Sequence, residues 1–290
     1  MTQTMPLRAS RTRYARRKFI NTLMLSLTGL ATLLAIIPLV WIVVYVTREG
    51  GRYLSVDFFT QLPTPVGVPG GGMANALVGS VIVVGIASLF AVPVGVAAAV
   101  YLSEYGRGIF ASVVRFTSDV LAGVPAIVAG IVAYALVVAK MHRFSAIAGS
   151  ASLALLMLPI IVRSSEEIFR TVPDTLREAS LALGIPRWKT ILRVVLSTAS
   201  GGLATGIMLA VARVGGEAAP LLFTAFSNSF WSVRPDQPID TLPVQLFTYA
   251  ISPYDDWHKQ AWAAALVLVL MVLLLNISAR LYMARKGFRR

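Results

Sequence analysis

The sequence contains no cysteine, which excludes disulfides, thiol catalysis and cysteine-bound metal. It has two histidines, His142 and His258, and neither has a second potential ligand at helical spacing, so we expect no metal site. Charged residues make up only 13% of the chain, against roughly 25% in soluble domains. A chain with so little charge is not a globule solvated by water.

What the sequence has instead is 57% hydrophobic residues, arranged in long apolar runs. A membrane-spanning helix needs about 20 mostly apolar residues, and six runs are of that order. They cover residues 19–46, 73–102, 116–139, 145–162, 199–226 and 262–282. Prolines within these runs need neighbouring helices or water to satisfy the freed carbonyls. We therefore predict an all-α bundle of six transmembrane helices.

The distribution of positive charge predicts how the bundle is oriented. Of the 26 Lys and Arg residues, most lie in residues 1–18, 103–118, 163–193 and the C-terminal tail. Cytoplasmic flanks of membrane spans are enriched in Lys and Arg, and six spans place these four segments on one side, with both termini cytoplasmic. The net charge of +13 would suggest nucleic acid in a soluble protein, but here it indicates basic membrane flanks.

We expect four parts along the chain. They are a basic cytoplasmic segment (1–18), a first helix with an external loop (19–72), a core of five spans with a cytoplasmic loop at 163–198 (73–283), and a basic cytoplasmic tail (284–290). The first apolar run is too long for a secretory signal. No lysine follows a glycine, so the chain has no Walker A motif and cannot itself hydrolyse ATP through one.

The cytoplasmic loop contains a second pattern. Ser164 and Glu167 have the spacing of a capping box. A short helix is then predicted from Asp174 to Leu183, with Gly184 as its stop and Pro186 opening the next helix. Its apolar face consists of Leu176, Ala179 and Leu183. So short a helix cannot bury this face alone, and it needs either the groove of a partner or the membrane surface.

This loop resembles the EAA loop of ABC importer permeases. Glu178-Ala179-Ser180, then Gly184, then Val194-Val195-Leu196-Ser197 have that family's spacing. Ser180, Val194 and Ser197 depart from its Ala, Ile and Pro. The resemblance implies that the loop docks an ATPase subunit. Glu178, Ala179, Ser180, Leu183 and Gly184 are the residues expected to couple the two proteins.

Further motifs narrow the resemblance. Asp119–Pro125, Ala212–Thr224 and Leu242–Gln245 are similar to the PstA-type permease of the phosphate-specific ABC importer, over about residues 70–290. That family implies a type I importer fold in a bacterial inner membrane. It also implies a heterodimer with a homologous second permease, two copies of a cytosolic ATPase that hold ATP and Mg²⁺, and an external phosphate-binding protein. This chain would carry no cofactor, no metal and no catalytic residue.

Arg213 and Glu217 are the candidate substrate residues. They stand four apart inside the fifth apolar run, so we expect them on one helix face, where charges are costly and usually functional. Arg213 would bind phosphate through its guanidinium, while Glu217 would weaken that site when empty and accept a hydrogen bond from protonated phosphate. The alternative is an ion pair that only fixes packing. Asp119, near the cytoplasmic end of its span, is interpreted as a solvated carboxylate.

Other functions remain open on sequence grounds. An ATP-driven importer of the same kind could import another oxyanion, such as sulfate or molybdate. The chain could also be a channel or an ion-coupled carrier working alone, although the EAA-like loop argues against that. A membrane enzyme is disfavoured because no nucleophile–base constellation lies near the spans. The external aromatic segments 230–234 and 254–257 are candidates for contact with a binding protein.

Overall fold

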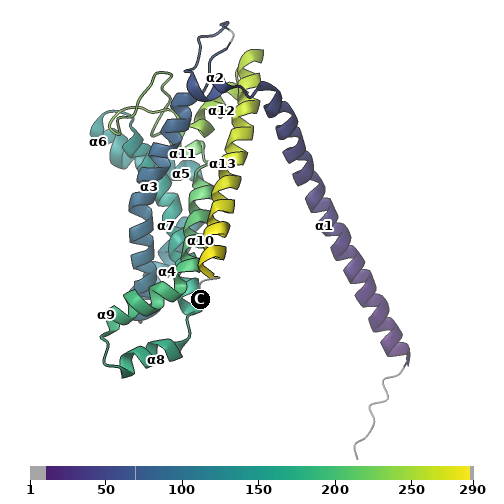
Figure 1. Ribbon diagram of the computed structural model, residues 1–290, viewed down its shortest axis with the longest axis vertical. Helices are drawn as coiled ribbons and strands as arrows, with labels where there is room; N and C mark the ends of the chain where they lie inside the picture. Colours follow the sequence, from purple (N-terminus) through teal and green to yellow (C-terminus); the bar gives the residue numbers. More distant parts are fainter. Residues whose placement is uncertain (1–10, 69, 288–290) are drawn as a thin grey trace, which may run out of the picture. The chain divides into compact units, whose positions relative to one another are not determined.

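The computed structural model describes residues 11–68 and 70–287, and within these ranges it is helical, with no strand (Figure 1). Five helices are long and apolar enough to cross a membrane, or six if one bent pair counts as a single span. The predicted all-α membrane architecture is therefore confirmed. The outermost parts of both basic termini, residues 1–10 and 288–290, lie outside the described residues. The chain forms two compact units that divide after Glu49.

The first unit consists of most of α1, which runs from Arg11 to Tyr53. The apolar side chains of this helix are exposed, among them Leu25 and Trp41. The helix extends beyond the predicted run 19–46 at both ends, because its polar flanks are rich in Arg and other good helix formers. With 43 residues it is about 64 Å long, roughly twice the hydrocarbon core.

The second unit, from Gly50 onward, is a bundle built around one helix. Its elements are α2 (Val56–Thr60), α3 (Ala74–Val100) with η1 (Tyr101–Tyr105), α4 (Ile109–Ala122), α5 (Ala126–Ala133) with η2 (Tyr134–Val138) and α6 (Ala139–Met141), α7 (Ala146–Arg170), α8 (Asp174–Ala182), α9 (Arg187–Thr190) with η3 (Ile191–Val195) and α10 (Leu196–Val214), α11 (Ala219–Leu222), α12 (Leu242–Ala250) and α13 (Asp255–Gly287). The central helix α7 packs against α3, α4, α5 and α10, while α13 packs against α10 and α12.

The core of this unit lies between α3 and α7. Val83 and Ala91 of α3 are fully buried with Leu153 and Met157 of α7. Small residues let these helices approach closely, which is how helices associate in membranes. We call the end of the unit that carries α8 and α9 the α8 end, and the opposite end, with α2, the α2 end (Figure 1).

The third predicted span, 116–139, is not one straight helix. The chain forms α4 and then a second helical stretch, Ala126–Met141, bent by 109° relative to α4. Pro125 precedes that second stretch, and a proline cannot continue the hydrogen bonds of the helix before it. The prediction of a continuous span is therefore wrong, and the sequence signal for the break was Gly123 and Pro125.

The fifth span is shifted along the sequence relative to the prediction of 199–226. The helical stretch runs from Arg187 to Val214, so it begins and ends 12 residues earlier (199 − 187 and 226 − 214). Two glycines follow Val214, and Pro220 lies in the first turn of a separate short helix, α11. Glycine pairs and proline are poor helix formers, and this explains why the apolar run continues while the helix does not.

The predicted capping box is also wrong, because α7 passes through Ser164 and Glu167 without interruption. The helix begins much earlier, where the side chain of Ser145 accepts a hydrogen bond from the Ala148 amide. The apolar core contacts of α7 hold it helical through the polar stretch, so a local capping signal does not decide the boundary.

The connection between α11 and α12 closes the α2 end of the bundle. The first amides of α7 donate to this connection, with Ala146 bonded to the Gln237 carbonyl and Ile147 to that of Pro235. Asp240 within it is buried, and its carboxylate accepts hydrogen bonds from Ser227 and the Thr241 amide. Burial raises the pKa of Asp240 to about 7, although the two hydrogen bonds act to lower it. Compared with the unfolded chain, the folded protein therefore favours the protonated form of this carboxyl group.

Asp240 predicts a pH dependence of stability. The pKa of Asp240 is higher in the folded protein (about 7) than in the unfolded chain (3.8). Its stabilising contribution to the free energy of unfolding is therefore fully present below pH 3.8 and is lost as the pH rises to about 7. We expect the thermal unfolding midpoint of the detergent-solubilised protein to fall less between pH 5 and 8 in Asp240→Asn than in the natural chain. Parallel pH profiles of the two proteins would contradict this account.

Candidate functional site

Helix α8 projects an uncovered apolar face from the α8 end of the bundle. It spans Asp174–Ala182 and is followed by Gly184 at a φ of +75°, a backbone conformation that suits glycine at a helix stop. This confirms the predicted helix. Leu176, Ala179 and Leu183 are all exposed, Leu183 to 80%, as is Glu178. The face is therefore available to a partner or to a membrane surface.

Ser180 differs from the other predicted coupling residues because it is buried. Its hydroxyl lies 2.9 Å from that of Thr190 in α9, so it joins the two short helices. The small Ser in place of the family's Ala thus supplies a hydrogen bond inside the loop. Ser180 therefore lies on the side of α8 that meets α9, away from the surface that Leu183 presents.

A buried ion pair fixes α8 to the bundle. Arg177 of α8 and Glu104 of η1 are 2.8 Å apart, with side chains 17% and 6% exposed. Arg177 also donates to the carbonyls of Phe169 and Val172 and to Asp174. Sequence reasoning missed this pair. The available signal was a lone Glu at the end of a long apolar run, which needs a partner when buried.

A second charged network joins α4 to α7 nearby. Arg163 donates to both carboxylate oxygens of Asp119, at 2.7 Å each. Glu166 accepts from Arg115 and Arg170, also at 2.7 Å. Asp119 is 51% exposed, but it is held by a two-pronged ion pair. The interpretation of Asp119 as a simply solvated carboxylate therefore needs correcting.

Arg213 and Glu217 are close in sequence but do not share a helix face. Arg213 is the penultimate residue of α10. Glu217 lies beyond its end, in a turn where its amide bonds to the Val214 carbonyl. In the part of the chain that the structure describes, no ion pair of either residue is observed. The expected i, i+4 arrangement is wrong because the helix stops at Val214.

The face of α10 that carries Arg213 is uncovered. Thr198, Thr205, Leu209 and Arg213 are exposed along it. The opposite face is buried, through residues such as Leu203, Ala210 and Val214. We call this face the polar stripe of α10 because it carries two threonines and a guanidinium beside Leu209. Ionisable residues in a membrane-spanning helix normally face a bundle interior or a water-filled cavity.

A close backbone contact determines where the chain goes after Glu217. A Cβ placed on Gly130 of α5 would lie 2.7 Å from the Cα of Pro220 in α11, so only glycine fits. α11 can therefore pack directly on α5, and Leu221 joins the core beneath it. The turn that contains Glu217 is thus held at the surface of the bundle, next to the end of α10.

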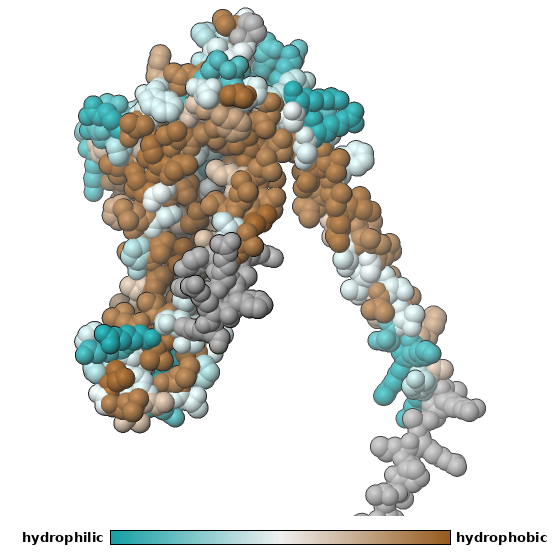
Figure 2. All heavy atoms as spheres, in the orientation of Figure 1, coloured by the Kyte–Doolittle hydropathy of each residue, from teal (hydrophilic) through white to brown (hydrophobic). Residues whose placement is uncertain are grey.

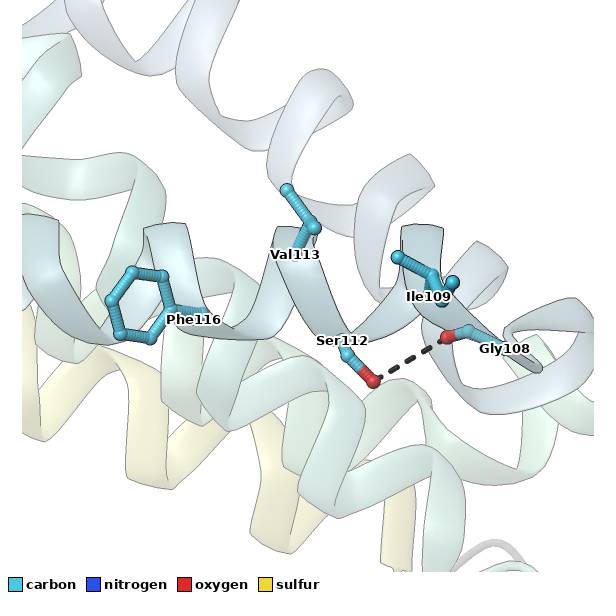
Figure 3. A pocket seen from close by; sticks show the side chains of 5 residues that line it. All are labelled: Gly108, Ile109, Ser112, Val113 and Phe116. Atoms are coloured by element: carbon cyan, nitrogen blue, oxygen red, sulfur yellow. Dashed lines mark hydrogen bonds between the residues drawn. The ribbon is translucent and has the colours of Figure 1, made fainter.

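The lateral surface of the second unit is apolar between its two more polar ends (Figure 2). On α4, Ile109, Val113 and Phe116 are exposed and line a shallow apolar hollow together with Ser112 and Gly108 (Figure 3). The Ser112 hydroxyl donates back to the Gly108 carbonyl, so it does not disturb the apolar character of the face. Such a surface suits lipid or another apolar helix. No cluster of potential metal ligands occurs among the described residues.

Comparison with known proteins places the chain in a family. Residues 91–286 match the model of the binding-protein-dependent transport system inner membrane component. The chain is 44% identical over 277 residues to the phosphate transport system permease protein PstA of Yersinia pestis, covering 95% of this chain and 94% of that protein. It is 39% identical to PstA 1 of Mycobacterium tuberculosis over 269 residues, covering 91% and 88% of the two chains.

Solved structures share the fold at low sequence identity. A chain of a bacterial alginate ABC transporter, in complex with an alginate pentasaccharide-bound periplasmic protein, aligns with a TM-score of 0.66 at 12% identity, covering 94% and 96% of the chains. A chain of the MetNI methionine ABC transporter, in an inward-facing conformation, aligns at 0.56 and 16%, covering 86% and 97%. The chain belongs to the binding-protein-dependent transport system inner membrane components, and within that family to the PstA-type permeases.

Proposed function

We propose that this chain is a permease subunit of an ATP-driven importer of inorganic phosphate, and that Arg213 binds the anion in transit. The observation that carries the proposal is the unpaired guanidinium on the uncovered face of α10. A charge in a membrane span costs at least about 2.5 kcal/mol, and this one has no protein counter-ion within the described chain. The names of the relatives, which are phosphate transport system permeases, support phosphate as the substrate.

A second, homologous permease would cover the uncovered faces of this chain. The polar stripe of α10 would then face the partner across a shared path, and the apolar surface of α4 would meet the partner or lipid. Two membrane subunits that each contribute a stripe form a polar route that neither could form alone. With the orientation predicted from the basic flanks, the α8 end faces the cytosol.

In this assembly, α8 docks a cytosolic ATPase, present in two copies. Its exposed Leu176, Ala179 and Leu183 are suited to a hydrophobic groove, and the buried Arg177–Glu104 pair transmits displacement of α8 to the end of α3. At the α2 end, exposed Phe230 and Trp231 are candidate contacts for an external phosphate-binding protein. Trp257 is a weaker candidate, because its ring stacks on Tyr249 at 4.3 Å.

The placement of Glu217 bears on substrate choice. Since no ion pair with Arg213 is observed, Glu217 does not neutralise that residue by direct contact. From its turn it can accept a hydrogen bond from protonated phosphate, which fully ionised sulfate cannot donate. The alternative substrate, another oxyanion such as sulfate or molybdate, would leave this carboxylate repelling the anion.

The substrate assignment predicts the behaviour of Arg213→Gln. We expect phosphate uptake at low external concentration to fall about a hundredfold, because two charge-assisted hydrogen bonds are lost. Uptake of labelled phosphate and sulfate would be measured in cells that lack the chromosomal copy, with complex assembly verified. Lys140→Gln, at an exposed position of α6, is the control. Normal uptake by Arg213→Gln would reduce Arg213 to a packing residue, and natural-chain uptake of sulfate in place of phosphate would favour the alternative.

Glu217→Gln tests selectivity separately. An amide presents an N–H group as well as a carbonyl oxygen, so it tolerates fully ionised sulfate better than a carboxylate does. We expect the ratio of phosphate to sulfate transport to fall about tenfold in the variant. The measurement is competition by sulfate against labelled phosphate uptake. An unchanged ratio together with an unchanged rate would remove Glu217 from the site.

The coupling role predicts that Arg177→Met is severely destabilising, because it leaves Glu104 buried without a partner. Removing one member of a buried pair costs about 3–5 kcal/mol. The double variant Arg177→Met with Glu104→Gln should recover much of the thermal stability of the purified complex, yet not its transport-coupled ATPase activity. Asp174→Ala, which removes only an exposed partner of Arg177, is the control. Recovery of full coupling in the double variant would show that the pair is dispensable.

A further inference from the structure

A pocket of about 340 Å³ lies at the α8 end, where five segments of the chain meet. We call it the arginine pocket. Its lining residues are Ser103, Glu104, Tyr105, Gly106, Arg107, Arg170, Asp174, Arg177 and Arg187. They come from η1, the connection to α4, the last turn of α7, α8 and the start of α9. Four arginines against two carboxylates leave an excess of positive charge.

The ion pairs of the pocket show which arginine is structural. Arg177 is satisfied by the Glu104 carboxylate, by Asp174 and by two backbone carbonyls. Glu104 in turn is buried and is neutralised by that same guanidinium. These two residues therefore form the floor of the pocket, and they have no capacity left for a ligand of either charge.

The other three arginines are incompletely neutralised. Among the described residues, no hydrogen bond or ion pair of Arg107 is observed. Arg187 donates to a neutral acceptor, the Glu104 carbonyl, and lies 4.7 Å from the Tyr105 ring centre. Arg170 is 59% exposed and binds Glu166, whose single charge it shares with Arg115 and, at 3.6 Å, with Arg163.

Such an arrangement matches a phosphate group. Planar guanidinium groups bind phosphate oxygens in a two-pronged manner, and three of them around one pocket can surround a tetrahedral anion. The lining has a net excess of two positive charges, which would balance the two negative charges of a hydrogen phosphate dianion. Like-charged guanidiniums gathered with too few counter-ions repel each other, and a bound anion would relieve that repulsion.

We propose that the arginine pocket binds a phosphate group, either free phosphate or the headgroup of an anionic phospholipid. Arg107 and Arg170 would be its principal ligands, with Arg187 beside them. The bound group would bridge the η1–α4 connection to the base of α7 and to the α8–α9 loop. It would thereby fix α8 relative to the rest of the bundle. This second anion site is separate from Arg213, and its exposure to cytosol rests on the orientation under the proposed function.

The test uses the assembled complex of permeases and ATPase subunits in nanodiscs, with Arg213→Gln as the common background to remove the transport site. The pocket variant is Arg107→Gln with Arg170→Gln. The control is Arg193→Gln, because Arg193 is exposed at the same end and does not line the pocket. In one arm, binding of labelled inorganic phosphate is measured in neutral phosphatidylcholine. In the other, the thermal midpoint is compared between phosphatidylcholine and phosphatidylglycerol nanodiscs.

We expect the pocket variant to weaken binding at least about tenfold per arginine removed, with the control unchanged. Loss in the phosphate arm identifies free phosphate as the ligand, and loss of a phosphatidylglycerol-dependent rise in midpoint identifies the headgroup. If neither arm depends on Arg107 and Arg170, or if Arg193→Gln has the same effect, the proposal is overturned. Because the background lacks Arg213, this result is independent of whether phosphate is the transported substrate.

Discussion

The buried ion pair between Arg177 and Glu104 is the constraint on which the cytosol-facing part of the proposed importer depends. A short helix such as α8 has too few apolar contacts to hold its own position. The guanidinium supplies that position by bonding at once to Glu104 of η1, which continues α3, to one carbonyl in the last turn of α7 and one just beyond it, and to Asp174. Separating the pair would leave a charge in a dry environment, so α8 and the end of α3 are expected to move together.

The second unit is structurally incomplete as a single chain in a membrane. Its core between α3 and α7 is well packed, but α10 exposes hydroxyls and a guanidinium on the side that the core does not use. Lipid would leave the guanidinium of Arg213 unsatisfied, whereas a water-filled space bounded by a second subunit would not. Under the proposed function, the same sequence specifies a stable half-bundle and one wall of a polar route.

The prediction from sequence was most successful where one physical signal dominates. Long apolar runs determine the helical membrane fold, and the apolar spacing with Gly184 defined α8 nearly to the residue. The fifth span was wrongly predicted to continue beyond Gly215, and the third was wrongly predicted to pass through Pro125. Hydropathy does not distinguish a helix from a buried turn of the same composition. The pairs Arg177–Glu104 and Arg163–Asp119 join residues 73 and 44 positions apart. Their formation depends on helix packing, which a single sequence does not reveal.

The π-helical segment η3 has a consequence for how this region is compared with its relatives. At its end the Leu196 amide bonds to the Ile191 carbonyl, five residues back, so the turn holds one residue more than an α-helical turn. Residues beyond it are therefore displaced by roughly 100° about the helix axis from where a uniform α-helix would place them. Helical-wheel diagrams drawn from Arg187 through Val214 as a uniform α-helix would therefore assign Arg213 to the wrong side. Because the wide turn absorbs the extra residue, loss of one residue here would restore an ordinary α-helical turn and leave the polar stripe of α10 on the same side.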